Sequence, residues 1–462
     1  MNQPNVLLLT IDTLRADTLG SYGHPDNLTP NLDRLAAEGI RFTQAITGGS
    51  WTQAAMPVIL TSSSASAYGG CLTALSPARP SPIETLAAHG YSTGAFSTNP
   101  HLSTKTGYGR GFSHFEEFIP DERDPALRNV SGGQRLLRNT LFHRIVTPLG
   151  MQLRPARVYS PAQEVTDAAR RWIDNVQGPF FGWVHYMDIH WPYHLEGELT
   201  RPDELAAAWH DLAIMHQRAS FRRERDITST QRDRFLRLYL QALHYLDRQI
   251  GRLLDHLEAT GLADNTIVVV VSDHGEEFLD HGRWGHWESN LYDEIVRVPL
   301  LIRLPRHDDA TVIHRQVRTM DLMPTILDLC HCSVPGSGNG LSHMEGTSLV
   351  PLWNRSAGSY EVTEAICEMH RPPWHRIAVR TETHKYIWDN KRPRQPELYD
   401  LQADPEETTN VAADRAQLVD RFEAIVRRHL ERAATTKPAQ APDALELDDA
   451  TKRRLRALGY VD

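Results

Sequence analysis

The sequence predicts an α/β fold in which helices cover both faces of a large, mixed, mostly parallel sheet, followed by a smaller C-terminal α+β domain. Three observations support this prediction. The chain has 462 residues, of which 40% are hydrophobic, so it can bury one large core and a smaller second one. Short apolar runs alternate with segments of helical periodicity over residues 1–355. In residues 356–462 the pattern changes to short strands followed by one helix.

Five apolar runs are expected to form strands of the large sheet. Val6–Ile11 and Thr266–Val271 are aliphatic and β-branched throughout, as strands buried on both faces are. Asp12 follows the first run and Asp273 closely follows the second. Because ligands of open parallel sheets bind at the carboxyl ends of strands, the two aspartates together mark a candidate site, although either one alone is more often a turn or cap residue. The other predicted strands are Gly94–Ser97, Phe180–His185 and Val298–Arg303.

Helix signals separate these strands. Thr29 and Pro30 open a helical pattern that closes at Gly39. A longer amphipathic segment, about Thr230–Ala259, repeats its apolar residues close to the helical period. The C-terminal elements are predicted as strands Arg376–Val379, Lys385–Trp388 and Glu397–Leu401 and a helix near Gln417–Arg432.

The charge balance argues against a nucleic-acid partner. The chain carries 49 basic and 58 acidic residues, a net charge of −9, whereas nucleic-acid-binding proteins usually have a basic surplus. A small anionic substrate needs only local positive charge. Lys105 is the sole lysine before Lys385, so this charge has to come from arginine, histidine or a metal. Residues 121–160 hold seven arginines against three acidic residues, which indicates either a solvated loop or a lid that attracts an anion.

The N-terminal segment and the cysteines predict a cytoplasmic protein. The segment Met1–Asp12 has no basic region and an apolar run of only six residues, too short for a signal peptide or a membrane span. The four cysteines show neither a disulfide framework nor C-x-x-C zinc spacing. We expect no membrane partner, and a homo-oligomer is compatible with the sequence.

Histidines gather close to Asp273. An adjacent aspartate and histidine, Asp273 and His274, offer a carboxylate and an imidazole that together suit a divalent cation. His281 and His286 follow in a glycine-rich segment that can fold back over the same strand end. Three histidines within thirteen residues favour a functional cluster over three separate structural ones.

Two further segments carry polar groups near predicted strand ends. In Phe180–His194, His190 precedes Trp191-Pro192, whose proline restricts the backbone before it, whereas His185 inside the strand is as readily a core residue. In Thr47–Thr61, two glycines precede Ser50 and Thr52 and then an apolar, helical stretch. A hydroxyl at a helix N-terminus suits anion binding and stabilises an alkoxide, with an ordinary helix cap as the alternative.

Five ordered segments, spread over nearly the whole chain, carry a family resemblance. They are Asn5–Asp12 with Arg15–Asp17 and Gly20–Gly23; Thr29–Phe42; Ser272–Gly275; Leu291–Glu294 with Arg297–Pro299; and Glu397–Leu401 with Asp404-Pro405. Together these segments resemble the sulfatase family, within the alkaline phosphatase superfamily. The resemblance implies an alkaline phosphatase-like catalytic domain over residues 1–355 and a metal-dependent hydrolase of sulfate or phosphate esters.

The resemblance assigns metal and nucleophile positions. Asp12, Asp273 and His274 resemble the metal ligands, and Thr52, nine residues before Thr61, falls where the family keeps its nucleophile and would also touch the metal. The cysteine, proline and arginine of the family's C-x-P-S-R motif are absent here. Threonine cannot be converted to the formylglycine aldehyde of sulfatases, and superfamily members with threonine at this position act on phosphoryl groups. The resemblance therefore favours phosphate or phosphonate esters over sulfate esters.

Other residues are expected to bind the ester or move a proton. Asn99 and His286 resemble the positions of two lysines that sulfatases place on the anion. His190 or His101 is predicted to protonate the leaving group, and His281 to help bind the substrate.

One divalent ion is expected as cofactor. Thr13 stands where many relatives have a second aspartate, and the remaining ligands suit Mn²⁺, Mg²⁺ or Ca²⁺ better than Zn²⁺. The rival is a two-metal site that adds Asp188, His194 and His281.

The leading hypothesis is thus a hydrolase of phosphate monoesters, phosphate diesters or phosphonate esters that forms a covalent threonyl intermediate. The alternatives are a sulfatase without formylglycine, a phospho-group transferase of the same fold, and a binding protein without catalysis. The retained ligand set argues against the last.

Overall fold

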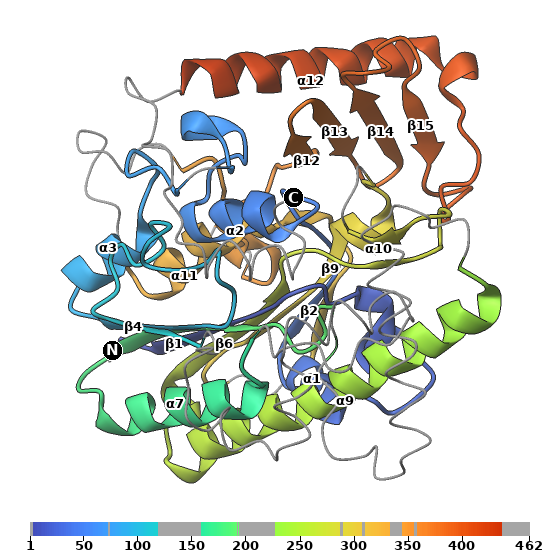
Figure 1. Ribbon diagram of the computed structural model, residues 1–462. Helices are drawn as coiled ribbons and strands as arrows, with labels where there is room; N and C mark the ends of the chain where they lie inside the picture. Colours follow the sequence, from blue (N-terminus) through green and yellow to red (C-terminus); the bar gives the residue numbers. More distant parts are fainter. Residues whose placement is uncertain are drawn as a thin grey trace, which may run out of the picture.

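A nine-stranded sheet forms the centre of the molecule. The computed structural model describes residues 3–72, 74–118, 159–191, 193, 227–286, 290–306, 310–332, 344–354 and 358–436. The strand order is β10-β2-β9-β6-β1-β5-β3-β4, and β11 also pairs with β2 (Figure 1). Only β9 runs antiparallel to its neighbours among these pairings, so the sheet is mixed and mostly parallel, as predicted. The strands are β1 (Asn5–Ile11), β2 (Ile40–Ile46), β3 (Ser92–Ser97), β4 (His114–Glu117), β5 (Phe180–Tyr186), β6 (Thr266–Ser272), β9 (Arg297–Arg303), β10 (Thr311–Ile313) and β11 (Val317–Arg318).

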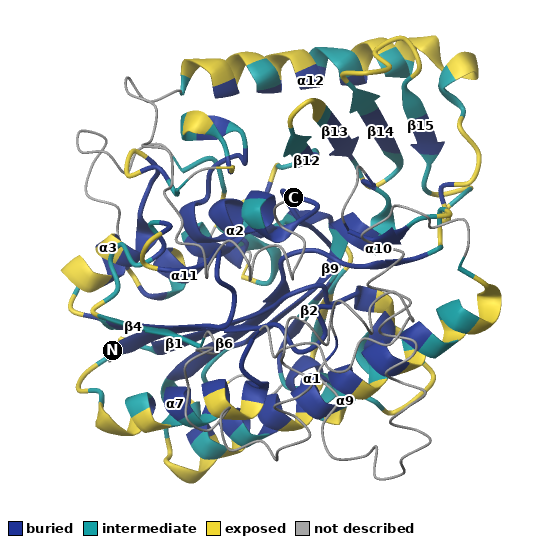
Figure 2. Ribbon diagram, viewed as in Figure 1, coloured by how far each residue is buried: buried dark blue, intermediate teal, exposed yellow. Residues whose placement is uncertain are grey.

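Both faces of this sheet are covered by helices. Side chains of a strand alternate between faces, so Leu7 and Leu9 of β1 pack into one apolar core and Val6 and Leu8 into the other. This two-sided burial explains why the central strands are continuous apolar runs, and Figure 2 shows them buried along their length. The first core contains α1 (Pro30–Ala37), α7 (Ala162–Asn175) and α9 (Ser229–Ala259), and the second contains α2 (Thr52–Thr61), α3 (Pro82–Ala88) and α11 (Leu322–Leu329).

A second, antiparallel sheet follows in the sequence and packs beside the first. Its strand order is β12-β13-β14-β15, and we call it the C-terminal sheet. Helix α12 (Ala416–Thr435) covers its outer face (Figure 1). The predicted short strands and single helix are confirmed, whereas the first strand of this sheet was not predicted. The strands are β12 (Ala365–Arg371), β13 (Trp374–Arg380), β14 (His384–Asp389) and β15 (Glu397–Asp400).

The parallel strands place several chain segments at one edge of the large sheet. β1, β3, β5 and β6 run in the same direction, so the residues that follow them lie along a common carboxyl edge. A short hairpin of β7 (Glu277–Phe278) and β8 (Trp284–Gly285) and the short helix α10 (Asp293–Val296) follow β6. Within the described residues, no helix combines the length and apolarity needed to cross a bilayer. The predicted arginine-rich lid falls almost wholly outside the described residues, and so does His194.

Candidate active site

Asp12, Asp273 and His274 converge at the carboxyl edge of the sheet. Asp12 follows β1, and Asp273 and His274 follow β6, the strand paired with β1. All three side chains are fully buried, and one donor atom from each lies within 4.8 Å of the others. His274 Nε2 is 3.6 Å from Asp12 Oδ1 and 3.6 Å from Asp273 Oδ2. The structure thus brings together the three residues that resemble the family's metal ligands.

The chemistry of this cluster fits a divalent cation. Asp12 Oδ1 and Asp273 Oδ2 are buried and accept no hydrogen bond from the described residues, an arrangement that is costly for a carboxylate without a positive partner. His274 Nδ1 donates to the Gly275 carbonyl oxygen over 2.8 Å, so in the neutral ring the lone pair is on Nε2, the atom nearest both oxygens. Two carboxylates and one imidazole nitrogen are ligands that Mn²⁺, Mg²⁺ and Zn²⁺ all accept.

Thr52 lies against this cluster as the first residue of α2. Its fully buried Oγ1 donates to Asp12 Oδ2 over 3.3 Å and lies 3.4 Å from His274 Nε2. The helix N-terminus adds backbone N–H groups and the positive end of the helix dipole. The loop before it packs tightly on the helix, since a Cβ at Gly49 would lie 2.5 Å from backbone atoms of Ala54 and Ala55.

The C-terminal sheet holds the loop that leads to Thr52. The backbone N–H of Glu368 in β12 donates to the Gly48 carbonyl oxygen over 3.1 Å, and the Ser50 N–H donates to the Glu368 carbonyl oxygen over 3.3 Å. The buried Glu368 carboxylate also accepts hydrogen bonds from the backbone N–H and the hydroxyl of Ser66, beyond the other end of α2. Glu368 thereby fixes both flanks of the helix, a role that sequence reasoning missed.

Asn99 and His185 contact the same carboxylate from neighbouring strands. Asn99, in the loop after β3, donates from Nδ2 to Asp12 Oδ2 over 3.3 Å. His185 of β5 has Nε2 3.7 Å from Asp12 Oδ2 and Nδ1 2.8 Å from Thr10 Oγ1. His185 is therefore a core histidine that also orients Asp12. The sequence alone does not distinguish this role from a purely structural one.

His286, His190 and His101 stand around the cluster. The His286 ring centroid lies 4.4 Å from that of His274 and 5.1 Å from that of His190. Glu276 Oε1 lies 3.1 Å from His286 Nδ1, so this buried carboxylate orients the ring. Sequence reasoning did not select Glu276, although its position two residues after His274 was a usable signal. His101 Nδ1 lies 2.8 Å from the side-chain nitrogen of Gln53, the residue next to Thr52.

The structure does not bring His281 and Asp188 into this cluster. His281 lies in the β7–β8 turn, where Nδ1 is 2.7 Å from Glu294 Oε1, Nε2 is 3.1 Å from the Glu406 carbonyl oxygen, and the ring stacks on Tyr292. Asp188 Oδ1 accepts from the Ala162 N–H at the start of α7. Among the described residues, the one group of three with metal-binding geometry is Asp12, Asp273 and His274.

Comparison with known proteins agrees with this geometry. The family model described as sulfatase matches residues 4–332, and the model described as N-sulphoglucosamine sulphohydrolase, C-terminal, matches residues 282–434. The chain belongs to the sulfatase family. It is 24% identical over 471 residues to an arylsulfatase of Clostridium perfringens, covering 93% of this chain and 95% of the relative. It is 25% identical over 479 residues to an N-acetylglucosamine-6-O-sulfatase of Bacteroides thetaiotaomicron, covering 88% and 82%.

Solved structures show the same fold. The crystal structure of a phosphonate monoester hydrolase of Agrobacterium radiobacter aligns with a TM-score of 0.70 at 22% identity, covering 94% of this chain and 96% of that chain. The predicted alkaline phosphatase-like architecture is therefore confirmed for this sulfatase-family protein.

Burial controls the charge of this sulfatase-family site. Burial lowers the pKa of His274 and of His190, and lowers that of His286 to about 4 and that of His101 to about 3, so these rings are neutral at pH 7 without a ligand. Burial together with the charge of Asp12 raises the pKa of Asp273 to about 7. Burial alone would raise the pKa of Asp12, but His190, His185 and His274 hold it below its usual value.

Cation affinity is expected to increase with pH. Binding requires Asp273 without its proton, so the apparent affinity should rise about tenfold per pH unit below pH 7 and level off above it. Calorimetric titration with Mn²⁺ between pH 5.5 and 8.5 measures this dependence. An affinity that stays constant over the whole range would contradict a ligand role for Asp273 with a pKa near 7.

Proposed function

We propose that this protein is a metal-dependent hydrolase of phosphate monoesters, phosphate diesters or phosphonate esters that works through a covalent intermediate on Thr52. The position of Thr52 carries this proposal, because its hydroxyl lies 3.3 Å from Asp12 Oδ2 at a buried helix N-terminus. The β-carbon of threonine bears a methyl group, so its oxidation would stop at a ketone and could not yield the aldehyde that sulfatases use. A threonyl ester must instead be opened by water.

The chain's own residues supply most of the mechanism. Asp12, Asp273 and His274 would hold the cation, which when bound lowers the pKa of a nearby hydroxyl and offsets charge on the ester oxygens. In the first step Thr52 Oγ1 forms a bond to phosphorus while the bond to the leaving oxygen breaks. In the second step water adds to phosphorus, the bond to Oγ1 breaks, and Thr52 recovers its proton.

His190 is suited to move the protons of both steps. Its Nδ1 donates to the Trp191 carbonyl oxygen, so the neutral ring has its lone pair on Nε2. It can therefore accept the Thr52 proton and return it to the leaving oxygen, and then accept a proton from water. His101 is the alternative proton carrier. Asn99, which contacts Asp12, and His286, which contacts His274, would bind the remaining ester oxygens.

Substitution of His190 and His286, whose rings meet edge to face, is expected to cause graded losses. His190→Gln and His286→Gln should each lower kcat by about 10²–10³, because each removes one positioned group and leaves the three metal ligands intact. Steady-state kinetics together with metal content per chain measures the effect. Activity within about threefold of the natural protein in both variants would exclude these roles.

A panel of esters tests the proposed chemistry. An aryl phosphate, a phosphodiester, an aryl phosphonate monoester and an aryl sulfate are assayed with Mn²⁺, Mg²⁺, Ca²⁺ and Zn²⁺. We expect at least one phosphorus ester to exceed the sulfate ester in kcat/KM by about 10² or more. Dominant turnover of the sulfate ester would overturn the proposal.

Sulfate-ester hydrolysis is the second candidate function. It is favoured by the curated relatives, since the arylsulfatase and the N-acetylglucosamine-6-O-sulfatase align over 95% and 82% of their own lengths. The same site would then form a threonyl sulfate. Transfer to an acceptor alcohol in place of water is distinguished by product analysis in the presence of methanol or glycerol.

A further inference from the structure

A cavity of about 600 Å³ lies outside the catalytic cluster, between the β7–β8 hairpin with the segment after it and the C-terminal sheet. We call it the junction pocket. Its volume is in the range of small-molecule binding sites. Arg283 and Tyr292 line one side, and Arg371, Trp374, Lys391 and Arg392 line the other.

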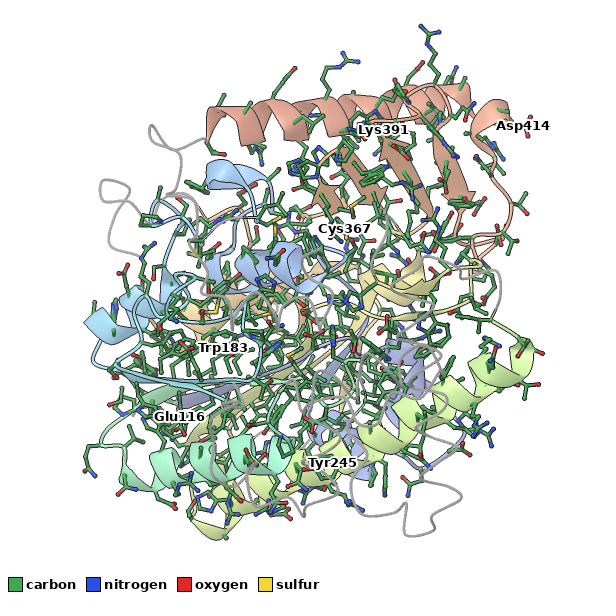
Figure 3. All side chains as sticks on the ribbon, viewed as in Figure 1. Glu116, Trp183, Tyr245, Cys367, Lys391 and Asp414 are labelled. Atoms are coloured by element: carbon green, nitrogen blue, oxygen red, sulfur yellow. The ribbon has the colours of Figure 1, made fainter. Side chains whose placement is uncertain are left out.

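One face of the C-terminal sheet changes from apolar to cationic side chains along its length. Cys367 and Met369 of β12 belong to the apolar cluster in which this sheet packs against Leu291 and Ile295. Because strand side chains alternate, Arg371 lies on the same face as Met369. Figure 3 shows Cys367 at the lower end of this sheet and Lys391 nearer its upper end. The face is thus apolar where it docks on the large sheet and cationic where the pocket opens.

The pocket concentrates positive charge in an acidic chain. Five arginine and lysine side chains line it against two carboxylates, whereas the whole chain carries −9. Both carboxylates contact the same cation, Arg376. Its Nη2 lies 2.6 Å from Glu397 Oε1, and its Nε lies 3.5 Å from Asp389 Oδ2. His281 is also in the wall; burial alone would lower its pKa, but its hydrogen bond and charge interaction with Glu294 raise it to about 9.

An aromatic ring lines the pocket together with these cations. Trp374 is 40% exposed and is one of three large hydrophobic side chains that are exposed within the described residues. Its indole lines the pocket together with the arginines. A flat, partly exposed indole next to guanidinium groups suits a ligand that joins a ring-shaped body to an anionic group.

Short chain segments connect both walls of the pocket to residues at the catalytic cluster. Arg283 precedes His286 by three residues, which span at most about 10 Å of chain. Arg371 follows Glu368 by three residues, and Glu368 is hydrogen-bonded to the Gly48–Ser50 loop directly before Thr52. Each wall is therefore joined by three residues of chain to a residue that contacts the catalytic cluster or the loop before Thr52.

We propose that the junction pocket binds a second anionic group of the substrate, a sulfate, phosphate or carboxylate attached to a ring such as a sugar or a nucleoside, while the scissile ester lies at Thr52. The arginines and Lys391 bind the anion, and Trp374 packs on the ring. This inference rests on the proposed function only for the position of the scissile ester. The natural substrate is then a multiply charged ester, and a small aryl ester uses only part of the binding surface.

The test compares two triple variants of the metal-loaded protein that remove the same charge. Arg371→Gln/Lys391→Gln/Arg392→Gln alters the pocket, and Arg421→Gln/Arg427→Gln/Arg428→Gln alters exposed positions on α12. Calorimetry measures binding of three probes: inorganic pyrophosphate, ADP and a sulfated disaccharide. We expect at least one probe to bind the pocket variant at least tenfold more weakly than the natural protein, with the α12 variant unchanged.

A third variant identifies the ring-bearing part of the ligand. Trp374→Ala is expected to weaken the binding of ADP or of the disaccharide severalfold and to leave the binding of pyrophosphate unchanged. Weaker binding of ADP would indicate a nucleoside ligand, and weaker binding of the disaccharide would indicate a sugar. Equal weakening of all three probes would overturn the role of Trp374. If both triple variants bound all probes equally well, or if the natural protein bound none of them, the proposal that the junction pocket binds an anionic group would be wrong.

Turnover of the small aryl ester separates the two proposals. It should be the same in both triple variants, because the substituted side chains lie outside the catalytic cluster. Normal turnover with unchanged probe binding would disprove the pocket alone. If the natural protein turned over no ester of the panel but the pocket variant still lost probe binding, the proposed hydrolase would be disproved and the anion site would be supported.

Discussion

Replacing Asp273 by asparagine is expected to remove the bound cation and the activity together. The substitution keeps the size of the buried side chain but exchanges one of two carboxylates for a neutral amide, at a position where Oδ2 lies 3.6 Å from His274 Nε2. Without a second negative charge the remaining ligands bind a divalent ion weakly. We expect kcat/KM to fall by at least about 10³, with less than a tenth of an equivalent of metal retained after dialysis.

A buried aspartate elsewhere provides the matched control. Asp247 is fully buried and accepts hydrogen bonds from the Asn31 and Leu32 N–H groups at the start of α1. Asp247→Asn is expected to lower the free energy of unfolding by about 1 kcal/mol, as loss of a helix-capping carboxylate does, while metal content and kcat stay normal. If Asp273→Asn instead kept a full equivalent of metal with activity within tenfold, the ligand assignment would be wrong.

Replacing Thr52 by valine is expected to abolish turnover without releasing the metal. Valine has the shape of threonine, with a methyl group in place of Oγ1, so helix α2 and the three metal ligands are preserved. Removal of a nucleophile should lower kcat by about 10³–10⁵. Thr52→Ser restores a hydroxyl and should recover activity to within about a hundredfold of the natural protein. Steady-state kinetics and metal analysis of the two variants measure both effects.

The opposite pattern would point to another nucleophile. If Thr52→Val kept activity within about tenfold while Asp273→Asn lost it, an activated water would have to attack the ester directly. The proposed threonyl intermediate would then be wrong, although the metal site would stand.

The three residues of the candidate metal site could be selected from sequence because they are local features of strand ends. Asp12 and Asp273 each follow an uninterrupted apolar run, and His274 is adjacent to Asp273. Two neighbouring parallel strands then carry these residues to the same edge without any long-range detail. The same reasoning identified the central strands, whose burial on both faces leaves a clear aliphatic pattern.

The remaining site residues depend on pairing that a single sequence does not display. His185 is next to Thr10 only through the register of β1 with β5, which sets its ring against Asp12. Glu368 reaches Gly49 across more than 300 positions of sequence, and it lies in the one strand of the C-terminal sheet that was not predicted. There the buried face toward α12 carries Glu368, so the strand lacks a regular apolar alternation.

His281 shows where spacing along the chain misleads. It lies only five residues before His286, which suggested that both rings serve the ester. The β7–β8 hairpin reverses the chain between them, with Glu277 paired to Gly285, so His286 faces His274 while His281 is carried to the turn. In the turn its ring meets Glu294 and Tyr292 and becomes part of the junction pocket.

The most direct test of the mechanism is to trap the covalent intermediate. The metal-loaded protein is mixed with the best phosphorus ester of the panel, quenched in acid at millisecond to second intervals, digested with trypsin and examined by mass spectrometry. A threonyl intermediate predicts a transient phosphoryl group on Thr52 in the peptide Phe42–Lys105, because the Arg79–Pro80 bond resists trypsin, and this group should be absent from Thr52→Val. Full turnover with no modified form of this peptide at any interval would contradict it.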